Sequence, residues 1–99
     1  KGKSDGIDIK GAAGAVVRAA DAGTVAAITQ DADQTPIIVI RHADNLLTVY
    51  ANVDNITVRK GANVARGQSI AKLRSGDANF LHFEVRKGFD SVDPMPYLR

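Results

Sequence analysis

The 99-residue chain contains no cysteine, no tryptophan and only two histidines. Without cysteine it can form neither a disulfide nor a cysteine-ligated zinc site. This absence leaves the cellular compartment open, because a cysteine-free domain suits oxidising and reducing surroundings equally. The 13 basic residues against 11 acidic ones give a net charge of +2 with histidine neutral. With so small a surplus and no dense run of Lys or Arg, we expect no nucleic-acid partner.

Long apolar stretches are also missing from the chain. The run from Pro36 to Ile40 is far shorter than the roughly 18 residues that a membrane-spanning helix needs, so we expect no membrane span. The sequence begins Lys1-Gly2-Lys3, with neither an initiating Met nor a signal peptide. We therefore expect residues 1–99 to be a single domain excised from a longer exported protein.

The apolar residues that are present recur with a period of two or in short runs, which turn-forming residues separate. This pattern is typical of short strands, and no segment of ten residues has helical periodicity. It predicts an all-β fold, a small antiparallel β-sandwich or partly open barrel with little or no helix. Strands are predicted at residues 7–9, 16–17, 24–29, 37–41, 46–51, 69–73 and 81–86.

Residues 58–70 contain a near-repeat, in which Val-x-x-Gly is followed by Val-x-x-Gly-Gln. The repeat predicts two turns with a short strand between them, and positive φ angles at Gly61 and Gly67. Clusters of turn-forming residues predict further turns at 31–34, 43–45 and 75–77.

One predicted strand carries a mixture of side chains that suits a binding surface. Strand alternation over residues 80–86 turns residues 81, 83 and 85 toward the core. The opposite face then combines an aromatic ring with polar and charged groups, and is either a functional surface or ordinary solvent-exposed surface: Phe80, His82, Glu84 and Arg86. The other histidine, His42, follows an apolar strand and precedes a turn, so it is predicted to be a structural residue at a strand end.

The order of several motifs resembles that of the LytM, or lysostaphin-like, peptidoglycan metallopeptidases. Ser4-Asp5-Gly6-Ile7-Asp8-Ile9 is similar to the zinc motif His-x-Gly-x-Asp of that family, and residues 81–86 are similar to its His-x-His strand. Residues 47–52 match its Tyr-Ala-His segment, and further similarity lies at 17–25, 39–43, 58–70 and 92–98. The resemblance implies a β-sandwich or partly open barrel of the LytM, or duplicated-hybrid-motif, type.

The chain departs from the active family members at three positions. Those members hold zinc with the first-motif His, the Asp four residues later and the second His of His-x-His. Ser4 stands in place of the first ligand, whereas Asp8 and His82 match the other two. The two catalytic histidines of the family correspond to Asn52 and Phe80. The resemblance therefore implies a degenerate domain without catalytic residues, in which Ser4, Asp8 and His82 are vestigial ligand positions.

These replacements predict that zinc is not bound. A catalytic zinc site needs three protein ligands and an open position, and a neutral serine hydroxyl is a poor substitute for imidazole. We expect no zinc, no other cofactor and no hydrolytic activity. We also expect Asp8 and His82 to hydrogen-bond or ion-pair across the former site, which would raise the pKa of the imidazole.

The chain resembles degenerate LytM domains of the EnvC, NlpD and DipM type, which activate periplasmic N-acetylmuramoyl-L-alanine amidases during cell division. The resemblance implies a non-catalytic regulator in the periplasm, at the division site. Its partner is expected to be such an amidase or another peptidoglycan hydrolase. The expected partner-binding surface is the vestigial groove, because arginine and aromatic residues are frequent binding hot spots: Asn52, Phe80, His82, Glu84 and Arg86.

Three alternatives stay open at this point. The groove could bind peptidoglycan itself without cleaving it, or ligands from another protein could complete a residual zinc endopeptidase. The Val-x-x-Gly repeat also occurs in biotinyl and lipoyl carrier domains, which present a modifiable Lys beside Met or acidic residues. Lys72 lies between Ala71 and Leu73, and the only methionine is Met95, so this third alternative has little support.

Overall fold

The computed structural model describes residues 6–74, 79–87 and 90–92. Ser4 and the turn predicted at 75–77 lie outside these residues. Within them, all seven predicted strands are confirmed, as is the short strand predicted between Gly61 and Gly67. The elements are β1 (Ile7–Lys10), β2 (Val16–Arg18), β3 (Gly23–Gln30), β4 (Pro36–Arg41), a 3₁₀ turn (Ala43–Asn45), β5 (Leu46–Ala51), β6 (Val53–Asp54), β7 (Asn63–Val64), β8 (Ser69–Leu73), β9 (Phe80–Lys87) and β10 (Asp90–Val92).

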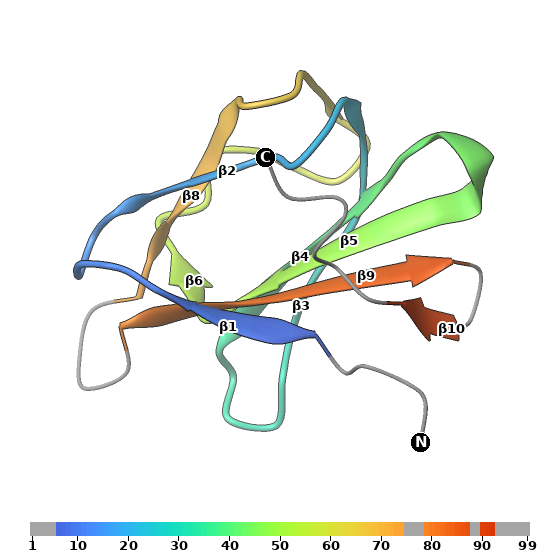
Figure 1. Ribbon diagram of the computed structural model, residues 1–99. Helices are drawn as coiled ribbons and strands as arrows, with labels where there is room; N and C mark the ends of the chain where they lie inside the picture. The colour runs from blue at the N-terminus through green and yellow to red at the C-terminus, as the bar shows by residue number, and fades with distance from the viewer. Residues whose placement is uncertain (1–5, 75–78, 88–89, 93–99) are drawn as a thin grey trace.

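The strands form two antiparallel sheets, which confirms the predicted fold class. The larger sheet has the spatial order β1-β9-β5-β4-β3-β7, and β10 pairs with β9 beyond the end of β1. The smaller sheet has the order β2-β8-β6 and lies over one end of the larger one (Figure 1). Over the residues that the structure describes, neither sheet closes into a barrel, because their edge strands do not pair with each other. No helix in the part of the chain described here is long and apolar enough to cross a membrane.

The core lies between the two sheets. Alternate residues of β4, β5 and β9 point into it from the larger sheet, as the period of two predicts for strands with one buried face. Burying each large apolar side chain contributes about 1.5–3 kcal/mol. The residues that are at most 1% exposed are Val25, Ile38, Ile40, Tyr50, Val53, Ile70, Ala71, Phe83 and Val85.

A chain of buried polar groups closes one end of this core. The ring of His42 lies between the carbonyl oxygen of Ala22, 2.7 Å from Nδ1, and the Thr48 hydroxyl, 2.7 Å from Nε2. Because a carbonyl can only accept, Nδ1 donates to Ala22, and Nε2 shares a hydrogen bond with Thr48 Oγ1. Thr48 Oγ1 also shares a hydrogen bond of 2.8 Å with the Tyr50 hydroxyl, which accepts from the Ala20 amide at 2.9 Å. His42 is thus the structural residue that the sequence predicts.

Glycines permit two left-handed turns and one close approach between strands. Gly61 and Gly67 have φ angles of +89° and +80°, which confirms the positive values predicted from the repeat. Gly23 lies against the His42 ring, and a Cβ at this position would be 2.8 Å from Nδ1. Only glycine therefore allows β3 to approach β4 this closely while the buried ring keeps its hydrogen bonds.

We predict that replacing Thr48 by Val lowers the free energy of unfolding by about 1–3 kcal/mol. The side chain keeps its shape, but His42 Nε2 and the Tyr50 hydroxyl each lose a hydrogen-bond partner in the interior. Urea unfolding followed by circular dichroism measures the change. The matched control is Thr29→Val, at an exposed strand position, which is expected to change stability by less than about 0.5 kcal/mol. Equal effects of the two substitutions would contradict a stabilising role for the polar chain.

Candidate functional site

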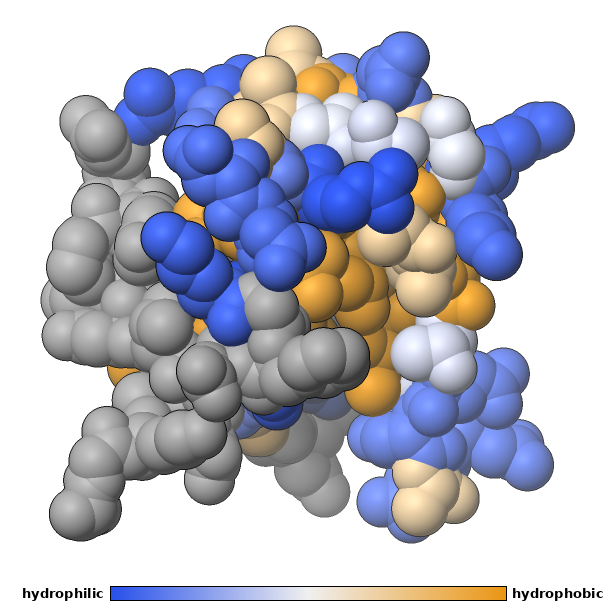
Figure 2. Space-filling view, turned by 90° about the vertical axis from the view of Figure 1, so that its right-hand side faces the viewer, coloured by the Kyte–Doolittle hydropathy of each residue, from blue (hydrophilic) through white to orange (hydrophobic). Residues whose placement is uncertain are grey.

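The face of the larger sheet that points away from the core carries an open groove. Its floor consists of half-buried apolar side chains of β4 and β5: Ile37, Val49 and Ala51. In the sheet register Ile37 lies opposite Ala51, and Ala51 lies opposite His82 of β9. The volume is about 530 Å³, within the range of ligand and peptide sites. Hydrophobic surface gathers in the middle of the face shown in Figure 2, between hydrophilic residues.

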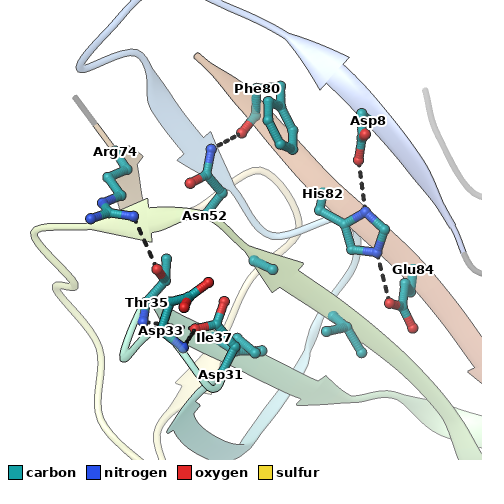
Figure 3. Close-up of a pocket in the computed structure, with 12 residues that line it drawn as sticks. Asp8, Asp31, Asp33, Thr35, Ile37, Asn52, Arg74, Phe80, His82 and Glu84 are labelled. Atoms are coloured by element: carbon teal, nitrogen blue, oxygen red, sulfur yellow. Dashed lines mark hydrogen bonds and ion pairs between the residues drawn. The ribbon is translucent and has the colours of Figure 1, made fainter. Parts of the chain in front are cut away.

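Strand β9 and the neighbouring β1 form one wall of the groove, which we call the β9 wall: Asp8, Phe80, His82 and Glu84. Asp8 lies directly opposite His82 in the β1–β9 pairing, and Glu84 shares the face of His82 because it follows two residues later. Figure 3 shows the imidazole between the two carboxylates. Nδ1 is 2.7 Å from Asp8 Oδ1, and Nε2 is 2.7 Å from Glu84 Oε2.

Arg86 extends this set of charges beyond the groove. Its Nε and Nη2 both donate to Glu84 Oε1, at 3.0 Å and 2.7 Å. Arg86 does not line the groove, whereas the other four residues of the predicted surface do. It therefore orients Glu84, whose side chain is only 14% exposed, toward His82.

The environment of His82 favours the doubly protonated ring. Partial burial by itself lowers the pKa of the imidazole, but hydrogen bonds to Asp8 and Glu84, together with their negative charges, outweigh it and raise the pKa above its ordinary value. Both carboxylates are acceptors, so both ring nitrogens must donate to satisfy them. The hydrogen bond expected between Asp8 and His82 is present, and Glu84 is a second partner that the sequence analysis did not identify.

Among the described residues, this arrangement supplies two of the three protein ligands that a catalytic zinc site needs, Asp8 and His82. Both nitrogens of His82 lie 2.7 Å from carboxylate oxygens, those of Asp8 and Glu84. Ser4, the third vestigial ligand position, lies outside the described residues. Across residues 6–74, 79–87 and 90–92, no group of three His, Asp or Glu side chains is placed to hold a metal ion.

The end of the groove is shaped by Asn52 and Phe80, which the motif resemblance predicts to stand at the positions of the family's catalytic histidines. Asn52 follows β5 with a φ angle of +68°, a left-handed conformation that asparagine tolerates better than most residues. The side-chain Nδ2 of Asn52 donates to the Phe80 backbone carbonyl at 2.6 Å, and the backbone carbonyl of Asn52 accepts from the Arg74 backbone amide at 3.1 Å. Asn52 therefore ties the end of β5 to β9 and to the chain after β8.

The second wall is the turn between β3 and β4, which we call the loop wall: Asp31, Asp33 and Thr35, with Arg74 beside them. Asp31 Oδ1 accepts from the amides of Asp33 and Thr35 at 2.8 Å and 3.0 Å, and Arg74 Nη1 donates to Thr35 Oγ1 at 3.0 Å. The sequence predicted a turn here but not its place beside the site. The sequence did contain a signal for this placement. Pairing of the predicted strands 37–41 and 46–51 puts the turn that precedes residue 37 next to the end of β5, where Asn52 lies.

We predict that the pKa of His82 in the folded domain lies above about 6.5, the value of an unperturbed histidine. Protonated His82 then stabilises the fold below about pH 6.5, and this contribution is lost as the pH rises through the folded pKa. NMR titration of the ring protons measures the pKa. Asp8→Asn removes one negative charge and is expected to lower it, while Asp54→Asn, on the smaller sheet, is the control. An unchanged pKa in Asp8→Asn would contradict the assigned pair.

Comparison with known proteins agrees with the motifs and the fold. A model of the family described as peptidase family M23 matches residues 2–94. The chain is 42% identical over 100 residues to outer membrane antigenic lipoprotein B of Haemophilus influenzae, covering 98% of this chain and 25% of that protein. It is 38% identical over 101 residues to murein hydrolase activator NlpD of Escherichia coli, covering 99% of this chain and 27% of that one. The chain thus spans about a quarter of the length of these two relatives.

Solved structures show the same architecture. Csd3 of Helicobacter pylori matches with a TM-score of 0.85 and 29% identity, over 96% of this chain and 26% of that one. A zinc-containing peptidase from Vibrio cholerae matches with a TM-score of 0.82 and 33% identity, over 92% and 29% of the two chains. The predicted resemblance to LytM domains is confirmed. Because the family model spans nearly the whole sequence and relatives and structures agree with it, this chain belongs to peptidase family M23.

Proposed function

We propose that this domain is a non-catalytic LytM-type regulator that binds and activates a peptidoglycan hydrolase through its groove. The observation that carries the proposal concerns the two former catalytic positions: the Asn52 side chain donates to the backbone carbonyl of Phe80, and the Phe80 side chain is apolar. The name of the Escherichia coli relative, murein hydrolase activator, supports a regulatory role.

The side chains at the former catalytic positions support a role without hydrolysis. General acid–base catalysis needs a group that can gain and lose a proton near neutral pH. The Asn52 amide does not titrate and donates to a backbone carbonyl, and Phe80 has no polar group. The residues of the β9 wall are thus suited to recognition.

The partner, in this proposal, is an N-acetylmuramoyl-L-alanine amidase of the periplasm that acts during cell division. The resemblance to domains of the EnvC, NlpD and DipM type supports this choice, and the relatives named lipoproteins support a place in the cell envelope. The domain would then be one part of a longer envelope protein, residues 1–99 of this sequence being its LytM unit.

Activation follows from differential binding. A regulator shifts its partner toward an active conformation only to the extent that it binds that conformation more tightly than the inactive one. A groove with an apolar floor and polar walls can supply such a difference, if it captures a segment that the inactive hydrolase holds against its own active site. The domain then needs no chemistry of its own.

We predict that the triple variant Phe80→Ala, His82→Ala, Arg86→Glu loses stimulation of the cognate amidase, by at least about tenfold. Truncation of a single hot-spot residue typically costs more than about 1–2 kcal/mol of binding, and three act together here. Dye release from labelled sacculi by the purified amidase, with and without the domain, measures the effect.

The control for this variant is Val16→Ala, at an exposed apolar position (46% exposed) on the smaller sheet, away from the groove. It is expected to stimulate like the parent domain. Thermal unfolding of each variant confirms that the fold persists. Full stimulation by the folded triple variant would show that the groove is not the binding surface, and binding to sacculi in place of the amidase would favour a peptidoglycan-binding module.

We further predict that the purified domain holds no stoichiometric zinc and releases no dye from sacculi by itself. Equilibrium dialysis against about micromolar zinc, followed by metal analysis, tests binding, because three-ligand sites hold zinc far more tightly than an Asp–His pair. One bound zinc per chain, together with hydrolysis that a chelator abolishes, would identify a peptidase and overturn the proposal.

A further inference from the structure

We infer that the groove takes a partner segment that carries a basic side chain next to an apolar one. The basic group would lie at the loop wall, and the apolar side chain would lie on the floor of Ile37, Val49 and Ala51. This inference rests on the proposed function and names the chemistry of the partner at that site. It follows from the charge of the groove and from where that charge is left uncompensated.

The groove differs in charge from the molecule as a whole. Four carboxylates line it, and among the described residues the cationic groups in its lining are Arg74 and His82. With both of these protonated the lining carries a net charge of −2, and counting Arg86, which pairs with Glu84 just outside the lining, leaves −1; the chain as a whole carries +2. The sign of the local charge is therefore reversed at the groove, which attracts a cationic segment and repels an acidic one.

Most of the negative charge on the β9 wall is compensated by His82 and by Arg86, which lies just outside the groove. Asp8 and Glu84 share the His82 imidazole, and Glu84 also accepts two hydrogen bonds from Arg86. Taken together, these four side chains are neutral when His82 is protonated. The β9 wall thus contributes shape and an aromatic contact from Phe80 more than net charge.

The loop wall lacks such compensation. Within the described residues the carboxylate of Asp33 has no side-chain partner, and Asp31 uses Oδ1 to accept from two backbone amides of its own turn. Arg74 donates to the hydroxyl of Thr35 and forms no ion pair with either carboxylate. In Figure 3 these two aspartates lie beside Ile37, across the floor from His82.

The acidic loop wall and the apolar floor lie side by side, and together they define the ligand that would complement them. A Lys or Arg side chain reaching Asp31 and Asp33 would remove net negative charge, while its aliphatic stem lies along apolar surface. A neighbouring apolar residue would cover Val49 and Ala51, which are half-buried in the free domain. Discrimination against an acidic segment follows from the same groups.

The first test uses the cognate amidase as the probe. We expect Asp33→Lys to weaken its affinity for the domain by about tenfold, measured by calorimetry, because an attraction becomes a repulsion. The matched control is Asp54→Lys, which makes the same charge change at an exposed position of the smaller sheet. Affinity of the parent domain is expected to fall several-fold between about 50 and about 300 mM salt. Equal affinities of the two variants, or no dependence on salt, would overturn the inference.

The second test does not depend on the amidase. The ¹⁵N-labelled domain is titrated with acetyl-Leu-Lys-Leu-amide and, separately, with acetyl-Leu-Glu-Leu-amide. The lysine peptide is expected to shift amide resonances of residues 31–37 and of β9, and the glutamate peptide is not. Equal shifts, or none with either peptide, would overturn the inference.

The two tests separate this inference from the proposed function. If the triple groove variant loses stimulation while Asp33→Lys and Asp54→Lys behave alike, the regulator role stands and the preference for a basic segment is wrong. If the lysine peptide is preferred but no hydrolase is stimulated, the chemistry of the groove stands and the proposed function is wrong.

Discussion

The pairing of β9 with β1 on one side and β5 on the other controls both faces of the larger sheet. On one face Phe83 and Val85 are fully buried against the smaller sheet, and on the other His82 and Glu84 line the groove. Because side chains alternate along a strand, a slip of one residue in the β1–β9 register would move Asp8 to the opposite face. Burial of the apolar face therefore enforces the register that brings the charged side chains of the polar face together.

Ion pairs connect four side chains at partly buried positions on this polar face. Asp8, His82, Glu84 and Arg86 alternate in sign along hydrogen bonds of 2.7–3.0 Å. A carboxylate as little exposed as Glu84 needs cationic neighbours, since a desolvated charge without a partner is costly. Charge on this side of the groove is thus largely compensated, whereas among the described residues the Asp33 carboxylate of the loop wall has no side-chain partner.

Local pattern was sufficient for most of the fold. Strands of four or more residues with alternating or β-branched sequences were located to within one or two residues, and the Val-x-x-Gly repeat located two left-handed glycines. Strands β6 and β10 were not predicted, because two or three residues show no period by themselves; β7, which is as short, was found from the two glycine turns that bracket it. The loop wall was missed for a different reason. Turn-forming residues predict that the chain reverses direction, but they do not predict which distant strand lies beside the turn.

The sequence by itself determined the fold class, the outward-facing residues of β9 and the absence of histidine at positions 4, 52 and 80, since these depend on local alternation and on residue identity. Only the tertiary structure decided what surrounds those residues. The register of the sheet places Asp8 beside His82, which is 74 residues away in the sequence. The side-chain conformation of His82 directs its Nε2 toward Glu84. The β3–β4 turn places Asp31 and Asp33 in the lining of the same groove. Charge compensation depends on distances between side chains, and such distances exist only once the strands have paired.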